Sequence, residues 1–206
     1  MYARSTTFTE KPDAIEPAIV LVRDEIMPAL QEMPGCTGLS MLVDRDSGSC
    51  IVTTGWDSHE TLRDSEMRVA PLREKAQRLF GGRPEVRVWE IGLLHRARFV
   101  ADGACARITW IRTDPARVQE LMDIFRTAVL PRVEELPGFC STSLLVDRAS
   151  GRGAFAATYE SREAMEGSRT AVSELRGETL GHTSSKLIDV AEMEVVLAHL
   201  RVPETV

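Results

Sequence analysis

The stretch Met33–Gly48, MPGCTGLSMLVDRDSG, returns 103 residues later as Leu136–Gly151, LPGFCSTSLLVDRASG. Extended on the C-terminal side, residues 34–73 and 137–176 share 15 of 40 positions without a gap. An internal repeat of this length indicates two copies of one structural unit, and it constrains the fold before any local prediction is made.

The repeat spans the whole chain. Its offset becomes 104 near the end, where His95 corresponds to His199. We therefore expect a first copy at 1–98, a second copy at 104–206 and a linker at 99–103.

Hydrophobic periodicity within each copy predicts the order β-α-β-β-α-β. Prolines that suit a first helical turn open the first helix of each copy, Pro12 and Pro115. Serines that suit the N-cap precede the second helices, Ser58 and Ser161. The predicted strands are Tyr2–Phe8, Thr37–Asp44, Cys50–Trp56 and Glu85–His95, then Ala106–Ile111, Cys140–Asp147, Ala154–Tyr159 and Ile188–Arg201.

This order is the ferredoxin-like pattern of an α+β fold. Helices cover only one face of such a sheet, so the other face needs a partner. We expect the second copy to supply it, which makes the chain a tandem ferredoxin-like repeat that forms an intramolecular dimeric α+β barrel. The long last strands also allow a homodimer of such pseudo-dimers.

Composition narrows the class of function. With 25 Lys and Arg against 31 Asp and Glu, the net charge is −6, which argues against a nucleic-acid partner. The most apolar run, Ala18–Val22, is five residues long, and the N-terminus lacks the pattern of an export signal. We expect no membrane partner and a cytoplasmic protein whose four cysteines are reduced thiols, since no CxxC occurs.

Motifs for metals and cofactors are absent from the sequence. The four histidines show no HxxxH or HExxH spacing, and no GxGxxG follows a predicted strand. No Gly-x-Ser-x-Gly supports a catalytic triad. We therefore predict no metal and no cofactor, and the sequence identifies no catalytic residue.

Both copies contain the same motif, in which a Pro-Gly pair and a hairpin precede the second helix. The helix opens with Trp56-Asp-Ser-x-Glu60 in the first copy and Tyr159-Glu-Ser-x-Glu163 in the second. In this motif each copy resembles the antibiotic biosynthesis monooxygenase family. The resemblance implies a dimeric α+β barrel. Its superfamily holds cofactor-free monooxygenases of aromatic polyketides, haem-degrading enzymes, isomerases and stress-related proteins without known activity, and a shared fold alone does not choose among them.

The haem-degrading branch uses a strand Asn, a helix Trp and an axial His. The corresponding positions here lie near Thr7, Ser65 and Glu74–Lys75, and near Trp110, Ser168 and Gly177–Glu178. None holds the required residue, and iron without an axial nitrogen lacks a protein ligand. We exclude haem degradation for both copies.

The ligand pocket is predicted between the sheet and the second helix of a copy, and its candidate residues are Trp56, Ser65 and Thr7 with their equivalents Tyr159, Ser168 and Trp110. Trp56 and Tyr159 either pack as core or pocket wall or offer a flat surface on which an aromatic ligand stacks, and both can hold at once. We expect a flat, apolar, uncharged or weakly anionic ligand near Trp56. The sequence leaves two functions open: a cofactor-independent monooxygenase of small aromatic or enolic compounds, or a non-catalytic ligand-binding or stress-related protein.

Overall fold

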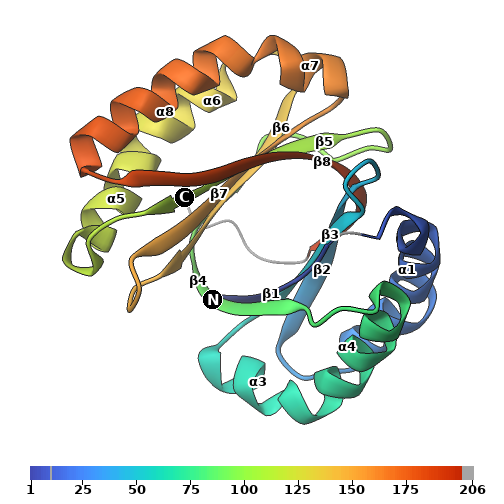
Figure 1. Cartoon of the computed structure of the whole chain (residues 1–206). Helices are drawn as coiled ribbons and strands as arrows, with labels where there is room; N and C mark the ends of the chain where they lie inside the picture. The colour runs from blue at the N-terminus through green and yellow to red at the C-terminus, as the bar shows by residue number, and fades with distance from the viewer. Residues whose placement is uncertain (10, 201–206) are drawn as a thin grey trace. The chain divides into compact units, whose positions relative to one another are not determined.

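A computed structural model describes residues 1–9 and 11–200, and the chain divides into two compact units (Figure 1). The first unit contains Met1–Trp89 and the C-terminal part of the last strand from Val195 on; the second contains Glu90–Glu194. The predicted repeats and the compact units therefore differ at the last strand of each repeat. The predicted linker 99–103 has neither helix nor strand.

The first unit is an antiparallel sheet with helices on one face (Figure 1). Strand β3 pairs with both β1 and β2. The elements are β1 (Tyr2–Phe8), α1 (Ile15–Leu21), α2 (Met27–Gln31), β2 (Cys36–Asp44), β3 (Ser49–Trp56), α3 (His59–Asp64), α4 (Glu66–Phe80) and the start of β4 (Glu85–Arg96).

The second unit repeats this order. Its strands pair antiparallel as β8-β5-β7-β6-β4. The elements are β5 (Cys105–Arg112), α5 (Val118–Ile124), α6 (Leu130–Glu134), β6 (Phe139–Asp147), β7 (Arg152–Tyr159), α7 (Arg162–Gly167), α8 (Arg169–Thr183) and β8 (Lys186–Leu200). The predicted end of the last strand, Arg201, lies outside the described residues.

Hydrogen bonding orders the eight strands β1-β3-β2-β8-β5-β7-β6-β4. This is the strand order of an eight-stranded antiparallel barrel within a mixed α+β fold. Among the described residues, no helix is long and apolar enough to span a bilayer.

The first helix of each unit is interrupted by a π-helical turn, at Val22–Ile26 and at Phe125–Val129. A proline follows each turn, Pro28 and Pro131. Because proline has no N–H and its ring crowds the carbonyl four residues earlier, a regular α-helix is unfavourable there. The wider turn avoids that clash, and its last bond runs from the Met27 N–H to the carbonyl of Val22, five residues back.

The hairpin turn of each unit depends on a glycine, Gly48 or Gly151. Both have φ of +69°, in the left-handed region that favours glycine. A Cβ atom at Gly48 would lie 2.3 Å from the Pro12 backbone nitrogen, and one at Gly151 would lie 2.1 Å from the Thr113 carbonyl oxygen. The repeated glycine therefore lets the turn pack against the start of the first helix.

Candidate functional site

A buried arginine lies at the centre of the contacts between the first unit's sheet and its second helical segment. Arg4 on β1 is 3% exposed. Its guanidinium donates to Ser65 Oγ at 3.1 Å and to the carbonyl of Leu62 at 2.7 Å, and it lies 3.0 Å from Glu66 Oε2. The same guanidinium carbon lies 5.8 Å from the ring centroid of Trp56. One side chain thus joins the strand, the α3–α4 junction and an aromatic ring.

Arg107 on β5 takes the corresponding place in the second unit. It is also 3% exposed, and its guanidinium donates to Ser168 Oγ at 2.9 Å and to the carbonyl of Met165 at 2.7 Å. Its carboxylate partner is Glu192 on β8, at 2.9 Å. The other oxygen of Glu192 accepts from Arg169 at 2.8 Å.

The two units place the carboxylate on different elements. The helix position occupied by Glu66 in the first unit is occupied by Arg169 in the second, 103 residues later. At the offset of 104, Val88 corresponds to Glu192. Each buried guanidinium therefore keeps one carboxylate, which comes from the helix in the first unit and from the last strand in the second. Burial of an unpaired charge would be costly, so the two changes compensate one another.

Burial lowers the pKa of Arg4, and the Glu66 carboxylate acts in the opposite direction. Burial raises the pKa of Tyr159, while Ser168 and Arg107 beside it counteract the rise. Arg4, Arg107, Tyr159 and Ser168 are buried in the packed centres of the units, whereas the Glu66 side chain is 46% exposed.

The structure brings four of the six predicted pocket residues together in two pairs. Arg4 joins Trp56 with Ser65, and Arg107 lies beside Tyr159 and Ser168. Both strand-end rings, Trp56 and Tyr159, are 0% exposed. Their complete burial is that of packed core side chains.

The other two predicted residues, Thr7 and Trp110, lie on the opposite face of the sheet. Side chains alternate along a strand, and Phe8 and Ile111, their immediate neighbours, face the helices. Thr7 and Trp110 therefore point away from the helix-covered face. The six residues do not form one pocket in either unit, because the prediction by sequence position ignored this alternation.

The two buried arginines, Arg4 and Arg107, were not among the predicted site residues. The repeated Ala3-Arg4-x-Thr6 and Ala106-Arg107-x-Thr109 place a charged side chain on the same strand face as apolar core residues. A repeated charge at such a position is a sign of a buried, hydrogen-bonded group. That signal was available from the sequence alone.

An apolar cavity lies under α8 in the second unit and encloses about 410 Å³, part of it open to solvent. Its lining is mostly aliphatic and aromatic, from the sheet, the π-helical turn, α6 and α8: Thr109, Ile111, Phe125, Val129, Val133, Phe155, Val172, Leu175, Arg176, Thr179 and Leu180. The rings of Phe125 and Phe155 lie 4.9 Å apart. A lining of this apolar and aromatic kind suits a small apolar ligand.

The ligand was expected under the second helix near Trp56, in the first unit. The cavity just described is under the second helix, but of the second unit. In the first unit Phe8 and Phe80 stack with their ring centres 4.6 Å apart. The second unit has Ile111 and Thr183 at those positions, so smaller side chains occupy the space beside its α8.

All four cysteines are free thiols. Burial raises the pKa of Cys50 to about 12, so its thiol stays protonated at neutral pH. Within the described part of the chain, no three His, Cys, Asp or Glu side chains gather in a way that could hold a metal ion.

No family model matches the chain. Among solved structures, a predicted monooxygenase from Lactobacillus acidophilus aligns with a TM-score of 0.71 and 9% identity, over 97% of this chain and 96% of that one. An anthrone oxidase-like protein aligns with a TM-score of 0.69 and 14% identity, over 97% and 93%. At these identities the likeness shows the fold, which is that of monooxygenase-like proteins.

Two Mycobacterium tuberculosis proteins are much closer in sequence. Uncharacterized protein Rv2557 is 45% identical over 206 residues, which is all of this chain and 92% of that protein. Uncharacterized protein Rv2558 is 46% identical over 207 residues, which is all of this chain and 88% of that protein. Identity at this level over the full chain establishes common descent, and the chain belongs to the family of Rv2557 and Rv2558.

Proposed function

We propose that this protein binds a small, flat, apolar molecule in the cavity under α8, as a member of the antibiotic biosynthesis monooxygenase type of fold. The observation that carries the proposal is the pocket under α8, whose lining is mainly apolar and includes the rings of Phe125 and Phe155. The solved structures with this fold include monooxygenase-like proteins, which supports the same class of ligand.

The chemistry of the lining defines the ligand further. Phe125 and Phe155 offer aromatic surface for stacking. The polar groups in the lining are two threonine hydroxyls and the guanidinium of Arg176. The Thr179 hydroxyl already donates to the carbonyl of Leu175 at 2.8 Å, so it is an acceptor toward a ligand. A small aromatic or enolic compound with one acidic hydroxyl fits this lining, because its oxygen can bind Arg176 while its ring packs against the apolar side chains.

The reaction that this arrangement supports is cofactor-independent oxygenation. A bound enol or phenol that has lost a proton can pass electrons directly to dioxygen. One oxygen atom then enters the ring system as a carbonyl, and the other leaves as water with two hydrogens from the substrate. Arg176 would stabilise the enolate or phenolate oxygen by its charge.

The alternative is a non-catalytic ligand-binding or stress-related protein. One observation favours it: no Asp, Glu or His is among the described residues that line the cavity. Proton removal from carbon is usually assisted by such a group. The same cavity serves both functions, so ligand binding is the part that they share.

The experiment measures binding and oxygen uptake together. Calorimetric titration with 2-naphthol tests binding, and an oxygen electrode with anthrone tests oxygenation. Val172→Phe fills the cavity and should abolish both signals, while Val69→Phe, the equivalent change in the first unit, should retain them. Binding without oxygen uptake in the parent chain would establish the non-catalytic alternative. Unchanged 2-naphthol binding in Val172→Phe would overturn the proposed site.

We also propose that the two units are tandem ferredoxin-like repeats that form an intramolecular dimeric α+β barrel. The shared element order supports this, as do the π-helical turns at equivalent positions. Residues 1–98 expressed alone lack the part of β8 that belongs to the first unit, so they should dimerise or aggregate. A stable monomeric half would contradict this proposal.

Two further properties belong with that proposal. The long last strands would allow the full chain to form a homodimer, which sedimentation would reveal as twice the monomer mass. Four free thiols support a reducing, cytoplasmic location. Fractionation of cells that produce the protein tests that location.

A further inference from the structure

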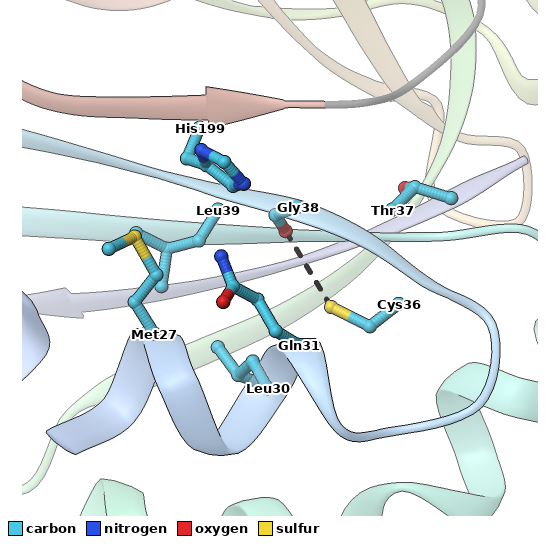
Figure 2. A pocket seen from close by; sticks show the side chains of 8 residues that line it. All are labelled: Met27, Leu30, Gln31, Cys36, Thr37, Gly38, Leu39 and His199. Atoms are coloured by element: carbon cyan, nitrogen blue, oxygen red, sulfur yellow. Dashed lines mark hydrogen bonds between the residues drawn. The ribbon is translucent and has the colours of Figure 1, made fainter.

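A second cavity lies in the first unit, and nothing described so far uses it. It lies between α2, β2 and β8 and opens to solvent. Figure 2 shows Met27, Leu30 and Gln31 on the helix side and His199 on the last strand opposite them. Cys36, Thr37, Gly38 and Leu39 complete the lining.

Two buried polar atoms in this lining have no hydrogen-bond partner among the described residues, Thr37 Oγ1 and His199 Nε2. A buried polar group without a hydrogen-bond partner is destabilising, because it has lost its contacts with water and gained none in return. Both atoms can donate a hydrogen bond, the histidine nitrogen in one of its neutral forms or when protonated. The cavity therefore offers two donors to an acceptor that the described part of the chain does not supply.

The backbone places Thr37 there by a β-bulge. Cys36 pairs with Trp56 and Gly38 pairs with Gly55, so Thr37 is the extra residue. Gly38 has φ of +138°, which a glycine accepts readily. Bulges often re-aim a side chain beside a functional site.

In the second unit, the equivalent histidine has a carboxylate partner. His95 corresponds to His199, and its Nε2 lies 2.6 Å from Glu134 Oε1. The residue that corresponds to Glu134 in the first unit is Gln31. The first unit thus keeps the imidazole and replaces its carboxylate with an amide.

A second substitution creates the space. The position of Phe139, a buried aromatic ring in the second unit, is taken by Cys36 in the first. The smaller thiol leaves room beside the imidazole. Burial raises the pKa of Cys36, so this thiol is a neutral wall of the cavity and not a nucleophile at neutral pH.

We propose that the cavity of the first unit binds a small organic monocarboxylate. The ligand carboxylate takes the place that Glu134 has in the second unit and accepts from His199 Nε2 and the Thr37 hydroxyl. Its apolar part lies against Met27, Leu30 and Leu39. The net charge of −6 and the absence of Lys and Arg from the described lining favour a single negative charge over a polyanion.

Benzoate is the probe, and the full chain labelled with ¹⁵N-histidine is the sample. Titration should shift the ring signals of His199, assigned through His199→Gln, and saturate at one benzoate per chain. Gln31→Glu restores the intramolecular carboxylate and should weaken binding at least tenfold. Cys36→Phe places the larger side chain of Phe139 in the lining of the first unit's cavity and should remove binding. Glu134→Gln, the matched control in the second unit, should leave benzoate affinity within twofold.

The benzoate site and the proposed 2-naphthol site under α8 can be tested independently of one another. Val172→Phe, which fills the cavity under α8, should leave benzoate binding unchanged, whereas Gln31→Glu should leave 2-naphthol binding unchanged. Gln31 is exposed, so its substitution tests the site even where Cys36→Phe does not fold. Absence of a His199 shift overturns the proposal, as does benzoate affinity unaffected by Gln31→Glu. Equal affinity for benzamide would show that the site does not require a carboxylate.

Discussion

Replacing Arg107 with Met should destabilise the second unit strongly, although methionine retains much of the side-chain length. The guanidinium makes hydrogen bonds to Ser168, Met165 and Glu192 at 2.7–2.9 Å, in a place that is 3% exposed. Methionine cannot donate to any of them. The Met165 carbonyl and the Glu192 carboxylate would lose their cationic partner inside the packed unit.

The magnitude follows from the kind of contact. A hydrogen bond to a charged group contributes about 1.5–3 kcal/mol, and three of them are not additive because one charge makes them all. Removal of one partner of a buried ion pair costs about 3–5 kcal/mol. Glu192 keeps its second contact to Arg169, which places the expected loss toward the lower end of that range. For a chain of this length, about 3 kcal/mol lowers Tm by about 6–12 °C.

The assay is thermal and urea unfolding followed by circular dichroism, with two comparisons. Arg112→Met, at the exposed end of the same strand, should change stability by less than about 0.5 kcal/mol. The double variant Arg107→Met with Glu192→Leu should be more stable than Arg107→Met alone, because it also removes a part-buried carboxylate that has lost one of its two arginine partners. If Arg107→Met unfolds at the same temperature as the parent chain, the buried guanidinium does not stabilise the unit and the reasoning is refuted.

Phe125→Ala should cost about 3–5 kcal/mol, since Phe125 is buried and its ring packs against that of Phe155, and equal urea midpoints for variant and parent would contradict this. Cys50 should react with a thiol reagent at pH 8 only after unfolding, because burial raises its pKa to about 12; rapid labelling of Cys50 itself in the native chain, located by peptide mass, would show that the strand opens. The hydrogen bonds from Arg148 lower the pKa of Glu90 below its unfolded value, so this pair contributes stability above about pH 4.3 that is lost as the pH falls through the lower folded value. Glu90→Gln should reduce the stability that the chain loses between neutral and acid pH by up to about 1 kcal/mol, as suits a part-exposed pair, and an identical acid profile for the variant would contradict the assignment.

The order of elements could be predicted because its signals are local. Prolines and serines mark helix starts, and the turn glycines Gly48 and Gly151 recur at the same offset as the rest of the repeat. Both second helices begin after the predicted serines, and Ser58 accepts from the Thr61 N–H as an N-cap does. The break of the first helix into a π-helical turn was not predicted, although Pro28 inside that helix was a visible reason for it.

The candidate pocket was predicted less well because it depends on strand faces. Trp56 and Ser65 do meet, through a residue that the prediction omitted, while Thr7 points to the other side of the same sheet. Successive side chains along a strand point to opposite faces of the sheet. A site position transferred from a related family with an error of one residue therefore does not say which face the side chain is on.

The sequence by itself determined the repeat, the nature and order of the elements and the lack of known metal or cofactor motifs, because periodicity, capping and motif spacing are properties of neighbouring residues. Only the tertiary structure decided that β4 and β8 are divided between the units, and that Arg107 takes its carboxylate from Glu192, 85 residues away. The two cavities could also be recognised only from the tertiary structure. A cavity is the difference between the space that the backbone encloses and the volume of the side chains that fill it. The sequence shows that Cys36 stands where the second copy has Phe139, but only the folded structure shows that Cys36 lines a cavity.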